Sequence, residues 1–139
     1  MADAFSVQQV DAAIEFVVND RAIDRAQTVR YTAVFDAAEM PRPQDLHADG
    51  DSAIVTAFMK AFHDRCIERG LPPLDSLVVL VAGSREGRPG KGYFTVNGVV
   101  DPFGEGGSAA AVARAAALWE QQKSEVRTWG IAHRRSRRL

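Results

Sequence analysis

The sequence predicts an α+β domain with three N-terminal helices, a short antiparallel β-meander that carries a long basic glycine-rich loop, and a long C-terminal helix. Three observations support this fold class. Apolar residues recur at helical spacing over 6–18 and 52–69. Residues 77–82 form a nearly unbroken aliphatic run, as in a central strand, and residues 108–129 repeat an apolar position every three or four residues.

Length and composition limit the classes of protein to which this chain can belong. The 139 residues are enough for one domain with its own hydrophobic core, which we expect over 1–133, followed by a basic flexible tail over 134–139. The net charge of −1 hides an asymmetry, because 1–80 holds 7 basic and 13 acidic residues whereas 81–139 holds 10 and 5. A single cysteine and no apolar run long enough to span a bilayer lead us to expect a cytoplasmic chain without membrane contact.

The first helix is predicted from its N-terminal signals. Ser6 can cap the helix and Gln9, three residues on, can cap in return, while Phe5 and Val10 have the spacing of a hydrophobic staple. The inward face is expected to consist of Val7, Val10, Ile14, Val17 and Val18.

A brief strand at 28–31 and a second helix at 31–39 follow. Val34, Phe35 and Ala38 are expected to point inward, and Pro41 is expected to end the helix.

The third helix is predicted over Ser52–Arg69. Asp51 is the expected cap, and Gly70 stands where a helix ends in a left-handed residue. The apolar stripe is expected to comprise Ile54, Ala57, Phe58, Ala61, Phe62 and Cys66. Cys66 is therefore expected to be a buried, inert thiol. His63, one turn away, could share a metal with it, but the sequence offers no second pair of ligands to complete a tetrahedral site.

The β-meander is predicted around the basic loop. The aliphatic run at 77–82 leads into the loop at 83–92, which is too rich in glycine and charge to enter a core. A second strand is expected at 93–96, and Asn97-Gly98 has the composition of a type I′ turn into a third strand at 99–100.

The last helix is predicted to begin after Ser108, as its cap, and to run to about Trp129. Its seam comprises Val112, Ala115, Trp119, Gln122, Val126 and Trp129. Such a seam packs either on the core of its own chain or on a second copy, so a homodimer through this helix is one expectation.

No motif for catalysis or for a cofactor is present. The glycines of 83–92 lack the spacing of a nucleotide phosphate loop, and they are followed by a predicted strand where such a loop needs a helix. Ser84 lacks the glycine-flanked turn of a hydrolase nucleophile. We therefore expect a non-enzymatic protein with no cofactor and no metal, although an enzyme of unknown type stays open, because catalytic groups are assembled in space.

In the order of its elements, the chain resembles the winged-helix family over about residues 6–100. The helix at 52–69 takes the place of the third helix, and the loop at 83–92 takes the place of the wing. This resemblance implies contact with nucleic acid. The third helix balances its cations with acids, which favours phosphate contacts over base recognition.

The expected phosphate-contacting residues are all basic: Arg85, Arg88, Lys91, Lys60, Arg65, Arg134, Arg135, Arg137 and Arg138. The alternative is a protein–protein interaction module that uses the hairpin or the C-terminal helix.

Overall fold

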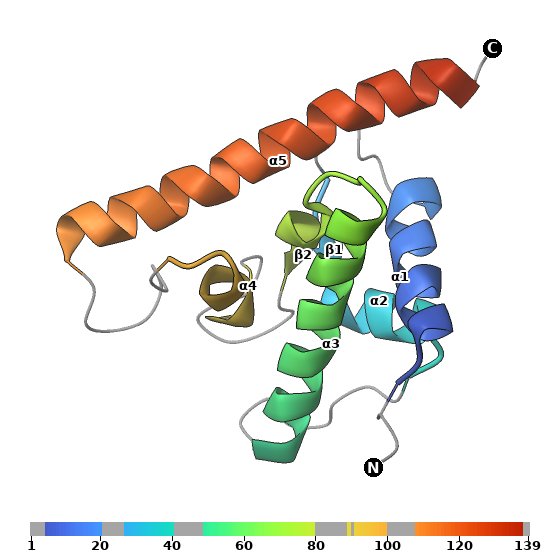
Figure 1. Cartoon of the computed structure of the whole chain (residues 1–139), viewed down its shortest axis with the longest axis horizontal. Coiled ribbons are helices and arrows are strands. Elements are labelled where there is room, and N and C mark those ends of the chain that lie inside the picture. Colours follow the sequence, from blue (N-terminus) through green and yellow to red (C-terminus); the bar gives the residue numbers. More distant parts are fainter. Residues whose placement is uncertain are drawn as a thin grey trace.

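The computed structural model describes residues 5–20, 27–40, 49–79, 89, 91–99 and 108–137. In chain order the described elements are α1 (Val7–Asp20), β1 (Val29–Arg30), α2 (Tyr31–Ala37), α3 (Asp49–Glu68), the 3-10 helix η2 (Leu74–Leu77), β2 (Val78–Val79), α4 (Lys91–Val96) and α5 (Ala109–Arg137). Figure 1 shows α1, α2 and α3 packed together, with α5 as a long helix that crosses above the C-terminal ends of α1 and α3. No helix in these ranges is both long and apolar enough to cross a membrane.

The predicted antiparallel meander is wrong. Residues 93–96 belong to α4, and the only sheet among the described residues is the two-stranded pair of β1 with β2, which run parallel with Val29 opposite Val78. Neighbouring side chains of a strand face opposite sides, so a strand here would have exposed either Tyr93 or Phe94. As a helix the segment buries both rings beside Ala115. The hairpin on which the winged-helix resemblance depended is therefore absent from this position.

The turn at Asn97-Gly98 ends a helix instead of joining two strands. Gly98 has a φ of 70°, its N–H donates to the carbonyl of Thr95 at 3.0 Å, and the N–H of Val99 donates to the carbonyl of Phe94 at 3.1 Å. These two bonds form a Schellman motif, which needs a positive φ at the glycine alone. The predicted type I′ turn would need a positive φ at Asn97 too, and Asn97 has none.

The N-terminus of α1 has the predicted capping box. The N–H of Gln9 donates to Ser6 Oγ at 3.2 Å, and the N–H of Ser6 donates to Gln9 Oε1 at 2.8 Å. Val10 is buried on the inner face, but Val7 is 58% exposed. The helix therefore begins where the sequence indicates, but the expected inward position of Val7 is wrong.

Helices α2 and α3 confirm most of their predicted inward faces. Val34 and Phe35 are fully buried, and so are Phe58 and Phe62 of α3, whereas Ile54 is 38% exposed. α3 begins at Asp49, two residues before the expected cap, and ends at Glu68, one residue before the predicted end. Gly70 has a φ of 67° and donates to the carbonyl of Ile67 at 3.1 Å.

The core has two parts. The larger cluster joins α1, α2 and α3 with η2 and β2 and includes Phe35, Phe58, Phe62 and Val126 of α5. The smaller cluster joins α4 to α5 through Tyr93, Phe94 and Ala115, with Trp119 packed against it. α5 thus contributes to both clusters.

α5 begins as predicted, because the N–H of Ala111 donates to Ser108 Oγ at 3.2 Å. It is 29 residues long and continues to Arg137, so residues 134–137 of the expected tail are helical. The seam packs on the body of its own chain: Ala115 and Val126 are fully buried, and Trp129 packs against the larger cluster.

Candidate functional site

Two of the predicted phosphate contacts lie on α3 and are already paired with acids. Lys60 Nζ is 2.8 Å from Asp64 Oδ2, one turn along the same helix. Arg65 makes two bonds to Asp11 of α1, at 2.8 Å from Nε and 3.1 Å from Nη2, and a third to Glu68 at 3.1 Å. These hydrogen bonds raise the pKa of Arg65 above its ordinary range.

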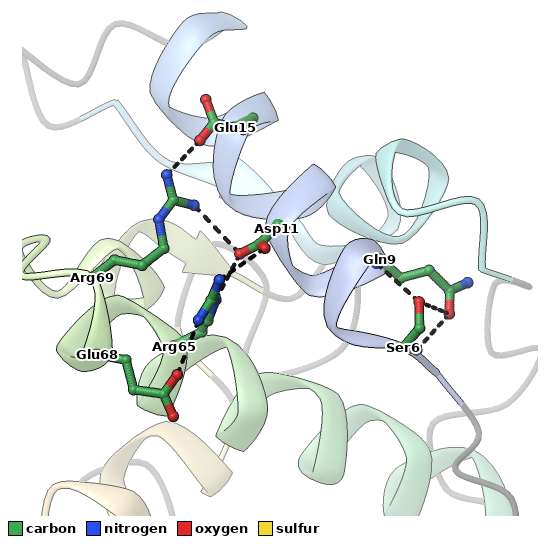
Figure 2. A network of polar contacts seen from close by, with 7 residues as sticks. All are labelled: Ser6, Gln9, Asp11, Glu15, Arg65, Glu68 and Arg69. Atoms are coloured by element: carbon green, nitrogen blue, oxygen red, sulfur yellow. Dashed lines mark hydrogen bonds and ion pairs between the residues drawn. The ribbon is translucent and has the colours of Figure 1, made fainter.

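Arg69 extends these contacts into an ion network between α1 and α3 (Figure 2). Its guanidinium reaches Asp11 at 3.4 Å and Glu15 at 2.7 Å, so that two acids one turn apart on α1 face Arg65 of α3 and Arg69, the residue that follows α3. The hydrogen bond from Arg65 is the largest influence that lowers the pKa of Asp11. The network joins two helices and leaves α3 without the free cations of a recognition helix.

The sequence contains a signal that could have predicted this network, namely the equal spacing of its acids on one helix and of its arginines on the other. Asp11 and Glu15 are four residues apart, as are Arg65 and Arg69, and each pair therefore lies on one side of its helix. Sequence reasoning assigned Arg65 to phosphate binding because it compared charges only within 52–69.

The predicted loop contributes little that the structure describes. Arg85 and Arg88 lie outside the described residues, and Lys91 is the first residue of α4, without a described side chain. Pro89 is fully buried, so one point of the loop is anchored in the protein.

The C-terminal part of α5 concentrates positive charge. Residues 127–137 contain four arginines and no acid. Arg127 and Arg134 are exposed and lie two turns apart on the same side of the helix. Arg135 and Arg137 belong to the helix by their backbone, and Arg138 lies outside the described residues.

The buried side of the same turns is aromatic. The imidazole of His133 stacks on the Trp129 ring with centroids 4.5 Å apart and an angle of 11° between the planes. Trp129 also packs against the larger core cluster, so these turns of α5 contact the body of the protein, while Arg127 and Arg134 are exposed.

A second polar cluster is buried, and sequence reasoning missed it. His63 Nδ1 of α3 lies 2.9 Å from Asp75 Oδ2 of η2, with the two side chains 13% and 3% exposed. The other carboxylate oxygen, Asp75 Oδ1, is buried and has no hydrogen-bond partner. The hydrogen bond to Asp75 is the main cause that raises the pKa of His63.

The charge of Asp75 also acts on two other titratable side chains, and both are kept neutral. Burial, and after it the charge of Asp75, raises the pKa of the Cys66 thiol to about 12, and the predicted burial of this cysteine is confirmed. The same two causes, in the same order, raise the pKa of Tyr93, whose hydroxyl donates to Gln122 Oε1 at 2.6 Å. No activated nucleophile is therefore present in this cluster.

Other features of the described residues do not form a stronger site. A shallow open depression lies between α1 and α2, lined by Ala12, Glu15, Phe16, Asn19, Ala33, Asp36 and Ala37. Its acids are Glu15 and Asp36, which disfavours a phosphate ligand. Within the described ranges no three His, Cys, Asp or Glu side chains are grouped so that they could hold a metal ion.

Comparisons of the chain with protein families, with curated proteins and with solved structures found no match.

Proposed function

We propose that this protein is a non-enzymatic binding domain that contacts nucleic-acid phosphates through the C-terminal turns of α5, together with the basic loop at 83–92. The observation that carries the proposal is the acid-free stretch 127–137, in which Arg127 and Arg134 are exposed on one side of a helix. Phosphate contacts of this kind supply most of the affinity in binding that does not depend on sequence.

The spacing of these cations suits a nucleic-acid backbone. Seven residues of helix advance about 10 Å, and successive phosphates of one strand are about 3.4 Å apart along the duplex axis. Arg127 and Arg134 can therefore contact one strand about three phosphates apart. Upstream, Glu120 and Glu125 are also exposed, so the surface that attracts phosphates begins near Arg127.

The proposal assigns fewer basic residues to phosphate contacts than the sequence indicated. Lys60 and Arg65 are engaged by acids of this chain, and we assign them to stability instead of binding. Without free cations on α3, we expect the affinity to vary little between unrelated sequences. The proposed compartment is the cytoplasm, because its reducing conditions agree with a buried cysteine that forms no disulfide.

Cations at the end of α5 have another role that the test must separate from binding. Arginines in the last turns of a helix offset the negative end of the helix dipole, by about 0.3–1 kcal/mol each. A variant that only loses this effect would be less stable but would have unchanged affinity and salt dependence. Binding must therefore be measured where each variant is fully folded.

The experiment compares three variants by fluorescence anisotropy, with labelled duplex DNA and single-stranded RNA of unrelated sequence, between about 50 and 200 mM salt. The double variant Arg127→Gln/Arg134→Gln should weaken binding equally for all duplexes and reduce the slope of log affinity against log salt by about 1.8. Arg114→Gln removes an exposed arginine near the other end of α5 and should change neither.

The loop is tested in parallel. Replacing Arg85, Arg88 and Lys91 with Ala should flatten the salt slope by up to about 3. If the unaltered protein binds no DNA or RNA at about 50 mM salt, the proposal is wrong and the protein–protein alternative takes its place. A homodimer through α5 would then have to use the outward face of the helix, because the seam already packs on this chain.

A further inference from the structure

The 3-10 helix η2 contacts both α3 and α5. On one side Asp75 bonds to His63 of α3 at 2.9 Å, and on the other the carbonyl of the next residue, Ser76, accepts the indole N–H of Trp119 at 2.8 Å. Ser76 is fully buried, and its hydroxyl donates to the carbonyl of Pro73 at 2.7 Å. A displacement of η2 from α3 would therefore move the acceptor on which α5 is fixed.

We propose that His63 and Asp75 form a proton-operated clasp, in which the protonated imidazole holds η2 against α3 and loss of that proton loosens the η2 platform on which α5 docks. The clasp is independent of the proposed binding of phosphates. It joins residues that no activity considered above requires.

The balance of charge around Asp75 is what makes the contact sensitive to protons. Its side chain is 3% exposed, and within the described part of the chain His63 is the only cation at ion-pair distance from it. One carboxylate oxygen already lacks a hydrogen-bond partner. Once His63 is neutral, Asp75 is a buried anion without a counter-charge, a state that proteins tolerate poorly.

The groups that face His63 from the packed elements support this assignment. They are Asp75 on η2, and Lys60 and Asp64 on α3 itself; Cys66 on α3 and Tyr93 on α4 respond to the charge of Asp75. Asp64 favours the protonated imidazole and Lys60 opposes it, but these two are paired with each other at 2.8 Å and partly exposed, so their effects largely offset. The acids of α1, Asp11 and Glu15, are engaged by Arg65 and Arg69.

The direction of the pH effect follows from the histidine. Folding raises the pKa of His63 above the ordinary value of 6.5, because the imidazolium gains the bond to Asp75. The stabilisation is therefore fully present below pH 6.5 and is lost as the pH rises through the higher pKa of the folded state.

The first measurement uses the unaltered protein and records the NMR titration of its histidine rings. The chain has three histidines, and the variants His63→Gln and His133→Gln assign two of the signals. The clasp requires a pKa of His63 above 6.5 in the folded state, and a value at or below 6.5 overturns it, whatever the variants do.

The second measurement follows Tm between pH 6 and pH 9. The unaltered protein should lose roughly 3 °C more over this range than His63→Gln, which keeps a hydrogen-bond donor but cannot take up the proton. His133→Gln, which removes the partly buried histidine beside Trp129, should keep the full loss. An unchanged pH dependence in a folded His63→Gln overturns the clasp.

The third measurement tests the link to α5. In a Trp129→Phe background the only remaining tryptophan is Trp119, whose emission reports the environment of its indole. Raising the pH through the measured pKa of His63 should shift this emission to longer wavelength, and adding His63→Gln should abolish the shift. Emission that stays constant while His63 titrates shows that α5 does not respond, and it overturns the proposed loosening.

Discussion

Trp119 is the residue whose removal tests the docking of α5 most directly. Its ring packs against the smaller core cluster, its indole N–H donates to the carbonyl of Ser76 at 2.8 Å, and the ammonium of Lys123 lies 3.8 Å from the ring centroid. The variant Trp119→Ala removes all three contacts at once. The variant Trp119→Phe keeps most of the apolar ring and removes the N–H donor.

The expected losses in the free energy of unfolding can be worked from these contacts. Truncation of a buried tryptophan costs about 3–5 kcal/mol, and because Trp119 is only partly buried we take the lower end, about 3 kcal/mol, for Trp119→Ala. Trp119→Phe leaves the buried carbonyl of Ser76 without its donor, which costs about 1–2 kcal/mol. Gln121→Ala, on the exposed side of α5, should stay within about 0.5 kcal/mol.

The assay is urea unfolding at pH 7, followed by far-UV circular dichroism, which reports the helical content, to which α5 contributes more residues than any other described helix. Emission of Trp129 gives a second probe of the same transition in both variants. A loss below about 1 kcal/mol in Trp119→Ala would refute the reasoning, because α5 would then dock without the ring. Equal losses in the two variants would assign the whole effect to the hydrogen bond.

Three further predictions concern local features. Gly70 has a φ of 67° and open space around it, so Gly70→Ala should cost about 1–2 kcal/mol from backbone strain alone in urea unfolding, and Gly70→Asn should cost less. Cys66 should resist a thiol reagent in the native state at pH 8, because burial raises its pKa to about 12, and rapid labelling would contradict its assignment to the core. The lowered pKa of Asp11 stabilises the fold above about pH 3.8 and loses that effect as the pH falls through the folded-state pKa. Asp11→Asn should therefore be less stable than the unaltered protein at pH 7 and nearly equal to it at about pH 2, and an equal difference at both pH values would exclude the pairing with Arg65.

The sequence by itself determined the features that depend on near neighbours in the chain. The capping box at Ser6, the cap at Ser108 and the left-handed end of α3 at Gly70 each involve residues three to five positions apart, and all three are present. The inward faces of α2 and most of α3 followed from helical periodicity for the same reason. The burial of Cys66 followed from its place on that stripe.

The strand and turn predicted at 93–98 were wrong because the same local sequence pattern is compatible with two structures. An aromatic and β-branched segment followed by Asn-Gly is typical of a hairpin, but the same glycine can end a helix. Packing of Tyr93 and Phe94 against Ala115 decided in favour of the helix, and Ala115 is about twenty residues further along the chain.

The remaining features were decided by tertiary structure, because they join residues that are distant in sequence. The sheet pairs Val29 with Val78, and the ion network joins Asp11 to Arg65 across 54 positions. The contact between His63 and Asp75 spans only 12 positions, yet it exists because η2 folds back against α3. The position of η2 in the chain carries no information about such a return, and likewise nothing within 52–69 shows that Arg65, which the sequence offered as a phosphate contact, pairs with an acid of another helix.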